Sequence, residues 1–264
     1  MINMIDSFPS GNIDNKNDKL EILYGIHSVQ EALNARQRIF FEIYFVKEKL
    51  SPTLQTIEFL AISLKIPVTK VKASFLKSLA KTSRHQGVAA RVSLYPFSDI
   101  SEIINNPKKS EYNNFLLLLD NIQDPHNLGA LARTALCAGV EGIVITKDRS
   151  AGPTPAACKA SAGALEHLPV ARVTNMAKFV KEIKKKEFWI IGMGGEARKS
   201  VFSIDLSCNI AIIIGGEEKG IRPLVKKECD YLVSIPQLGQ IDSLNASAAG
   251  AVVMYEALRQ RRYS

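Results

Sequence analysis

The 264-residue sequence has few cysteines and no long apolar run. Its four cysteines are widely spaced, with no C-x-x-C pair and no histidine at metal-ligand spacing, which argues against a disulfide scaffold or a zinc site. The longest apolar stretches, residues 115–119 and 210–214, are far shorter than the roughly 18 residues of a membrane span. The first nineteen residues lack the basic start and apolar core of a signal peptide. We therefore expect a cytoplasmic protein with no metal and no membrane contact.

Acidic residues are absent from one long window. Between Glu58 and Asp99 there is no Asp or Glu, and this window holds Lys65, Lys70, Lys72, Lys77, Lys81, Arg84 and Arg91. The whole chain has 34 Lys+Arg against 26 Asp+Glu, a formal net charge of +8, of which residues 1–110 contribute +5. An excess of positive charge favours a polyanionic partner. Nucleic acid is the interpretation we favour, and a solvated basic face is the alternative.

The composition, with 46% hydrophobic and 23% charged residues, is typical of a globular protein. Its pattern divides the chain into a disordered start (1–19), a small α/β domain (20–95), a Pro- and Asn-rich linker (96–114) and a larger domain (115–264). For the small domain the pattern predicts helices near 28–33, 53–64 and from 74, and strands at 39–46, 68–71 and 88–92.

From residue 115 onward, short apolar strands alternate with helical segments. We expect strands at 115–119, 142–146, 170–173, 188–191 and 210–214, and a last helix over 245–261. Uniformly apolar strands separated by crossover helices predict a mostly parallel sheet that is covered on both faces. The fold class is therefore α/β in both domains.

The first motif, residues 124–135, follows the first strand of the larger domain. Asp124 before Pro125 predicts a helix start, and Gly139 a helix end. Leu128, Leu131, Ala132, Ala135 and Leu136 should form its buried face. Gly129 lies one turn before Arg133, so we expect open space beside the guanidinium that a ligand could enter. An ordinary capped helix with a surface arginine is the alternative.

The second motif is a buried strand that enters a glycine-rich turn, residues 210–221, with Glu217 at its centre. Glycines there would let a ligand lie against backbone groups. The turn is neither a P-loop nor G-x-G-x-x-G, and a plain tight turn is the alternative. Residues 191–195 weakly resemble a dinucleotide-binding loop, but residues 196–206 have no helical period, so we do not favour that interpretation.

The third motif, residues 235–250, leads into the last helix. Ser243 or Asn245 should cap this helix, and capping alone would explain Ser243. The apolar face of the helix is predicted from a set of regularly spaced residues, Ala248, Ala251, Val252, Tyr255 and Leu258. The small residues at its start permit close backbone packing.

Together the three motifs closely resemble the signature of the SpoU, or TrmH, family of RNA ribose 2′-O-methyltransferases. The match is N-x-G-x-x-x-R at Asn127, Gly129 and Arg133, G-x-E-x-x-G at residues 215–220, and I-P-x-x-G-x-x-S-L-N at residues 235–245. Residues 24–29 and 86–88 resemble the smaller N-terminal RNA-binding domain of the family. The layout is most similar to the bacterial enzymes that methylate a guanosine 2′-oxygen in the peptidyl-transferase region of 23S ribosomal RNA.

The resemblance implies a trefoil knot in the larger domain and an L30e-like fold in the smaller one. It implies a homodimer with the active site at the interface. It also implies that S-adenosylmethionine is the cofactor, held in the knot largely by backbone groups. The cofactor-binding positions that it implies are Gly215, Gly220, Ile235, Leu238 and Leu244.

The resemblance also implies roles for five catalytic-site residues. Arg133 would act as general base or, because arginine is effectively always protonated, as an electrostatic stabiliser of the reacting oxygen. Asn127 would place the ribose or Arg133, and Glu217 would orient Arg133 or the substrate. Ser243 and Asn245 would hold the RNA and the motif scaffold.

Two other functions stay open at this point. One is a tRNA ribose 2′-O-methyltransferase, although the tRNA enzymes of this family generally lack the separate N-terminal domain. The other is a non-catalytic RNA-binding or ribosome-assembly factor, against which the intact Arg133, Glu217 and Asn245 argue.

Overall fold

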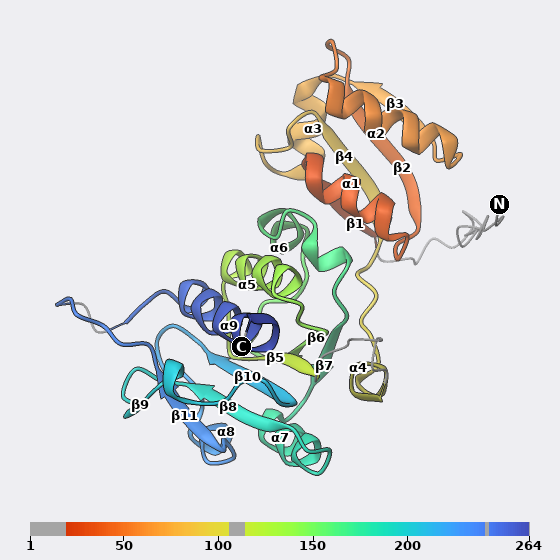
Figure 1. The fold of residues 1–264 in the computed structure, drawn as a ribbon. Coiled ribbons are helices and arrows are strands. Elements are labelled where there is room, and N and C mark those ends of the chain that lie inside the picture. Colours follow the sequence, from red (N-terminus) through yellow and green to blue (C-terminus); the bar gives the residue numbers. More distant parts are fainter. Residues whose placement is uncertain (1–19, 106–113, 241–242, 264) are drawn as a thin grey trace. The chain divides into compact units, whose positions relative to one another are not determined.

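The computed structural model describes residues 20–105, 114–240 and 243–263, which form two compact units (Figure 1). The first unit contains the described residues up to Pro96 together with Ala162–His167, and the second contains the others. The predicted disorder of residues 1–19 and part of the predicted linker lie outside the described residues. Among the described helices, none is long and apolar enough to cross a membrane.

The first unit is a four-stranded mixed sheet in the order β1-β4-β2-β3, in which only the β2–β3 pair is parallel. Its strands are β1 (Leu20–Tyr24), β2 (Phe40–Val46), β3 (Val68–Val71) and β4 (Val88–Ser93). Its helices are α1 (Ile26–Ala35), α2 (Pro52–Ser63) and α3 (Ala73–Ala80). The helices and strands predicted for the small domain are confirmed. The sequence pattern missed β1, a short edge strand that pairs with β4.

A buried ion pair joins residues 162–167 to the rest of the first unit. Both Nε and Nη2 of Arg38 lie 2.9 Å from the carboxylate oxygens of Glu166, and Nη1 lies 2.7 Å from Glu21. The side chains of Arg38 and Glu166 are 0% and 1% exposed. A bidentate pair satisfies several guanidinium donors at once, which a buried charge requires.

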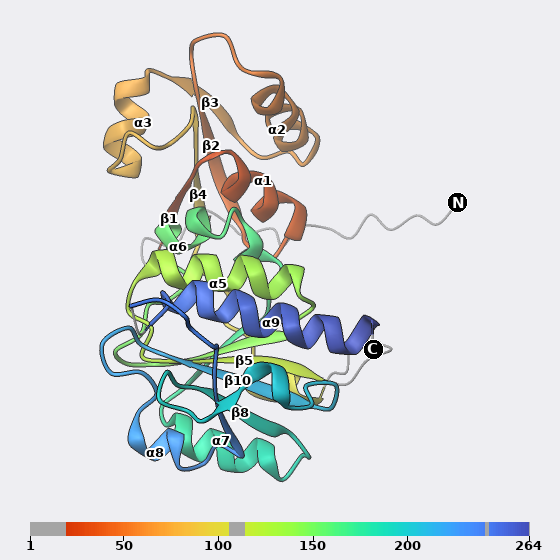
Figure 2. The same cartoon turned by 60° about the vertical axis from the view of Figure 1, so that its left-hand side comes forward.

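The second unit is a parallel sheet in the order β7-β6-β5-β10-β8-β11-β9. Its strands are β5 (Phe115–Asp120), β6 (Gly142–Thr146), β7 (Val170–Val173), β8 (Trp189–Met193), β9 (Lys199–Ser200), β10 (Ile210–Gly215) and β11 (Tyr231–Ser234). Its helices are α4 (Ile100–Asn105), α5 (Pro125–Cys137), α6 (Pro155–Ala160), α7 (Met176–Lys184), α8 (Pro223–Lys226) and α9 (Ala246–Tyr263). Helices α5 and α9 cover one face, and α7 and α8 cover the other (Figure 2).

The five predicted strands of the second unit are all present, which confirms the parallel α/β fold. Strands β5, β6 and β10 are apolar except for Asp120 and Thr146 at the ends of β5 and β6, because both of their faces are covered. Strands β9 and β11 were not predicted, since both are short and carry polar residues; β9 lies at the sheet edge and β11 next to it. The predicted linker contains α4, whose Ile103 is buried against Gly142. The knot and the L30e-like fold stay predictions.

Two predictions about the surroundings of helices α5 and α9 are wrong. No open space lies beside Gly129, because a Cβ there would come within 2.5 Å of the Ala160 Cβ; the glycine instead lets α5 and α6 pack closely. Helix α9 buries a different face from the predicted one, made of Ala246, Gly250, Val253, Met254, Glu256 and Ala257. Tyr255, on the face of α9 that was predicted to be buried, is 51% exposed. Leu136, which was predicted on the buried face of α5, is 37% exposed.

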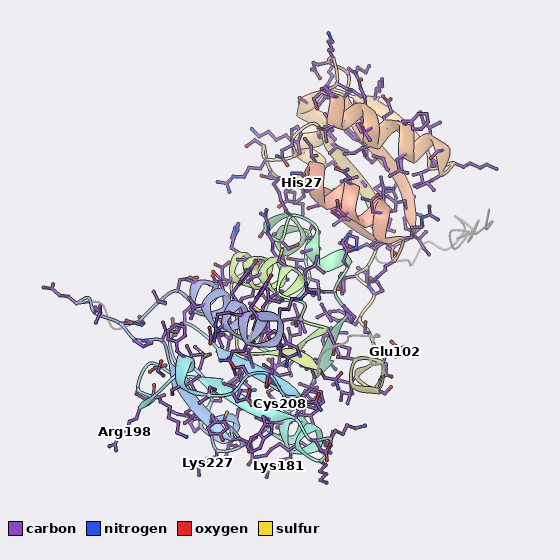
Figure 3. All side chains as sticks on the ribbon, in the orientation of Figure 1. His27, Glu102, Lys181, Arg198, Cys208 and Lys227 are labelled. Carbon is purple, nitrogen blue, oxygen red and sulfur yellow. The ribbon has the colours of Figure 1, made fainter. Side chains whose placement is uncertain are left out.

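We expect Glu166→Ala to lower the free energy of unfolding by about 3–5 kcal/mol, because it leaves the buried Arg38 charge without its main partner. The measurement is urea-induced unfolding. The matched control is Lys181→Ala on α7 (Figure 3), which removes an exposed pair with Glu228 and should change stability by less than about 1 kcal/mol. Equal losses in the two variants would contradict the structural role of the buried pair.

Candidate active site

A pocket of about 620 Å³ lies where strands β8, β10 and β11 of the second unit end. Its wall is formed by residues 193–196 after β8, 214–221 after β10, 234–237 after β11 and the segment from Ser243 that enters α9. Parallel sheets bind ligands outside the carboxyl ends of their strands, because the connecting loops converge there. The pocket is therefore the candidate binding site of this unit.

The glycine-rich turn after β10 closes on itself at the pocket wall. The amide of Gly220 donates to the carbonyl oxygen of Gly216 over 2.8 Å, and the amide of Gly216 donates to the carbonyl oxygen of Asp120 over 3.0 Å. A Cβ on Gly215 would lie 2.1 Å from the carbonyl carbon of Gly220. The tight turn is therefore confirmed, and because it lines the pocket, its contact with a ligand stays a prediction.

An ion pair that sequence reasoning missed holds this turn to the sheet. Asp120 ends β5, and its fully buried carboxylate accepts hydrogen bonds from the backbone amide of Arg222 at 2.8 Å and from its Nε at 2.8 Å. The Nη2 of Arg222 lies 2.6 Å from the same carboxylate. A single acidic residue that ends an otherwise apolar strand was the available signal.

The three sequence motifs meet in one hydrogen-bond network around Asn127, which is 9% exposed at the start of α5. Its Nδ2 donates to Oε1 of Glu217, and its Oδ1 accepts from Nδ2 of Asn245 over 3.1 Å. Oδ1 of Asn245 in turn accepts from the amide of Ser247 over 2.9 Å. Asn245, of the two candidates, therefore caps α9. The network fixes the carboxylate of Glu217 at the pocket wall.

The structure brings most of the predicted site residues together. The residues of that set that line the pocket are Gly215, Glu217, Gly220, Ile235, Ser243, Leu244 and Asn245. Leu238 is not among the lining residues, and its side chain is fully exposed. Residues 193–195, part of the weak dinucleotide-like pattern, line the pocket although they form no dinucleotide fingerprint.

Arg133 is the predicted site residue that stands apart. It is exposed on α5, and it follows Asn127 by six residues, which is about 600° of helical rotation and places it on another face. Cys137, one turn further along α5, is exposed as well. Helix α5 packs against α9, whose Ala248 and Tyr255 are also exposed. Arg133 thus lies on an exposed face of α5 and is not among the residues that line the pocket.

The fold and the site define a two-part RNA-modifying enzyme, and comparison with known families agrees. Residues 114–255 match the SpoU rRNA Methylase family, and residues 22–98 match the family model described as RNA 2'-O ribose methyltransferase substrate binding. The chain belongs to the SpoU rRNA Methylase family, whose members methylate the ribose 2′-oxygen of RNA.

Two relatives resemble the chain over nearly its whole length. A Bacillus subtilis protein named "Putative TrmH family tRNA/rRNA methyltransferase YacO" is 36% identical over 241 residues, which is 91% of this chain and 96% of the relative. The 23S rRNA (guanosine-2'-O-)-methyltransferase RlmB of Shewanella oneidensis is 38% identical over 251 residues, 92% of this chain and 99% of the relative. The names of the relatives thus include both tRNA and rRNA.

A solved structure has the same fold. The SpoU methyltransferase AviRb from Streptomyces viridochromogenes, in complex with the cofactor AdoMet, superposes with a TM-score of 0.78 at 23% sequence identity. The match covers 93% of this chain and 92% of AviRb. Both compact units are therefore found in one known protein.

We expect Gly215→Ala to lower the free energy of unfolding by about 1–3 kcal/mol, because the new Cβ would overlap backbone atoms that no side-chain rotation can move. The measurement is the thermal unfolding midpoint. The control is Gly152→Ala, where the added Cβ would meet no atom within 4 Å and the effect should stay within about 0.5 kcal/mol. An unchanged midpoint for Gly215→Ala would mean that the turn is more open than described.

Proposed function

We propose that this protein transfers a methyl group from S-adenosylmethionine to the ribose 2′-hydroxyl of a guanosine in 23S ribosomal RNA. The network that joins Asn127, Glu217 and Asn245 at the pocket is the observation that carries the catalytic part of this proposal. The ribosomal substrate is supported by the RlmB relative and by the separate unit that matches the substrate-binding model. A tRNA substrate is the alternative, supported by the name of the YacO relative.

The pocket suits S-adenosylmethionine in size and chemistry. Its volume of about 620 Å³ is typical of cofactor sites. Glycines 194, 195, 215 and 216 line the pocket without side chains, so a ligand can lie close to the backbone there, while Ile235 and Leu244 offer apolar surface to a purine. The carboxylates of Glu217 and Glu218 favour a cation. When bound, S-adenosylmethionine supplies an electrophilic methyl group on a positively charged sulfur.

The residues of the chain position the ribose and stabilise the charge that develops on it. The methyl group would pass from the sulfur to the 2′-oxygen, S-adenosylhomocysteine would be the leaving thioether, and the hydroxyl proton would go to solvent water. Glu217, held by Asn127, is placed to orient the substrate or an arginine. Arg133 stabilises the developing alkoxide or holds the adjacent phosphate, since a guanidinium is effectively always protonated and is therefore a poor base.

A homodimer explains why Arg133 lies away from the pocket of its own chain. The exposed residues of α5 and α9 include Leu136 and Tyr255, at 37% and 51%. We propose that a second copy covers these apolar side chains through the same surface, as two-fold dimers do. Arg133 would then reach the pocket of the partner subunit.

We expect Arg133→Ala to abolish methyl transfer and to leave S-adenosylmethionine binding unchanged, because the proposal places the arginine against the RNA and Arg133 is not among the residues that line the pocket. The assay incubates the protein with labelled S-adenosylmethionine and with rRNA or tRNA from a strain lacking the gene, and mass spectrometry maps the methylated nucleotide. Calorimetry measures cofactor affinity. The control is Lys181→Ala, an exposed cation on α7.

The outcomes of this assay distinguish the RNA substrate, the presence of catalysis and the role of Arg133. Methylation of a guanosine in 23S rRNA supports the proposal, and methylation of tRNA alone replaces it with the alternative. RNA binding without cofactor binding would identify a non-catalytic assembly factor. Full activity of Arg133→Ala would remove this residue from the mechanism.

We expect Tyr255→Asp to convert the dimer to a monomer, because a buried unpaired carboxylate is costly at an apolar interface. Sedimentation equilibrium measures the mass, and methyl transfer should fall with dimer content. Phe59→Asp is the control, since Phe59 is 75% exposed on α2 in the first unit. A wild-type monomer that transfers methyl groups would refute the dimer proposal.

A further inference from the structure

A second hollow, of about 460 Å³, lies within the first unit, whereas the candidate active site belongs to the second unit. Its lining residues are Lys47, Lys70, Val71, Lys72, Ser74 and Phe75. Three of these six are lysines and none is acidic. The hollow therefore combines positive charge with one aromatic ring.

Backbone hydrogen bonds hold the walls of this hollow in place. The amide of Lys47, just after β2, donates to the carbonyl oxygen of Val71 at the end of β3 over 2.9 Å. Lys72 is the N-cap residue of α3, and its carbonyl oxygen accepts from the amide of Phe75 over 2.9 Å. The backbone positions from which the two lysine side chains and the ring extend are thus fixed, which reduces the entropy lost when a ligand binds.

The Phe75 ring is exposed on one side and contacts the ring of Tyr44. It is 47% exposed, and its centroid lies 5.7 Å from that of Tyr44 at an interplanar angle of 51°. Tyr44 is itself 7% exposed, and its hydroxyl donates to Glu42 over 2.6 Å. A large apolar ring that is held at the surface in this way offers a free face for stacking.

The charges around the ring are largely uncompensated. In the part of the chain that the structure describes, neither Lys47 nor Lys72 forms an ion pair, and the first turn of α3 has no acidic residue. Lys70 pairs with Glu58 over 3.1 Å and is 51% exposed. A solvated basic face would account for the lysines but not for an exposed phenylalanine among them.

We propose that this hollow binds one nucleotide of a single-stranded RNA segment, with its base stacked on Phe75 and its phosphates near Lys47 and Lys72. Aromatic rings recognise unpaired bases because every base presents a π-face, and ammonium groups beside the ring neutralise the phosphates. The inference rests on the proposed function, since it names the RNA feature that the first unit holds. A base in a duplex is stacked on its neighbours and cannot use the ring.

The test measures fluorescence anisotropy of the full chain with a labelled 12-nucleotide single-stranded RNA and with a duplex of the same length. Phe75→Ala should weaken single-strand binding about 10-fold and leave duplex binding unchanged, because only unpaired bases stack on the ring. Phe75→Trp should retain the affinity. Phe59→Ala is the matched control, since Phe59 is an exposed ring outside the hollow.

A second variant separates charge from stacking. Lys72→Ala should reduce the slope of log affinity against log salt by about 0.7, because one phosphate contact is lost, whereas Phe75→Ala should leave that slope unchanged. Lys181→Ala, outside the hollow, should not alter it. Thermal unfolding of each variant checks that the fold is kept.

Two results would overturn the inference. One is an unchanged affinity of Phe75→Ala for the single-stranded RNA. The other is a loss of affinity that is equal for single strand and duplex and that occurs in Phe75→Trp as well as in Phe75→Ala. Both leave the proposed function intact as long as the wild type binds S-adenosylmethionine and methylates RNA. Failure of cofactor binding in calorimetry would refute the proposed function and would not bear on the hollow.

Discussion

The side-chain amide of Asn127 has to be satisfied inside the protein, because the residue is only 9% exposed. An unpaired buried donor or acceptor costs about 1–3 kcal/mol, so both ends of the amide constrain their surroundings. The donor end holds Glu217 after β10, and the acceptor end holds Asn245 at the start of α9. One polar side chain thereby fixes three distant chain segments in register around the pocket. The geometry of the site depends on that register.

Close backbone approach makes this arrangement possible. A Cβ on Gly250 of α9 would lie 2.3 Å from Cδ2 of Leu131 on α5, and one on Gly129 would strike α6. The absence of these side chains lets the helices on this face of the sheet pack closely. Their outward surface then carries Arg133 with Leu136 and Tyr255, which is why catalysis and dimerisation are tied together in our proposal.

The division of labour between the two units has a physical basis. Deep, glycine-lined pockets form where parallel strands end, and such a pocket suits a small cofactor. The small mixed sheet of the first unit offers a shallower, lysine-lined hollow with an exposed ring, which suits a flexible polyanion. Binding a large RNA and a small methyl donor requires both kinds of surface, and in our proposal each unit provides one of them.

The sequence by itself determined the strands of both sheets other than β1, β9 and β11, and the Asp124 cap of α5, because apolar periodicity and local capping act over a few residues. The resemblance of the three motifs to one family signature indicated that they belong to one site. The sequence did not determine the open space expected at Gly129, the buried face of α9 or the Asp120–Arg222 pair. Those depend on which helix or turn comes to lie against a residue, and a periodic pattern cannot distinguish a face covered by its own chain from one left for a partner. Tertiary packing alone decided where Arg133 lies, because the helix that carries it buries the side opposite to its charge.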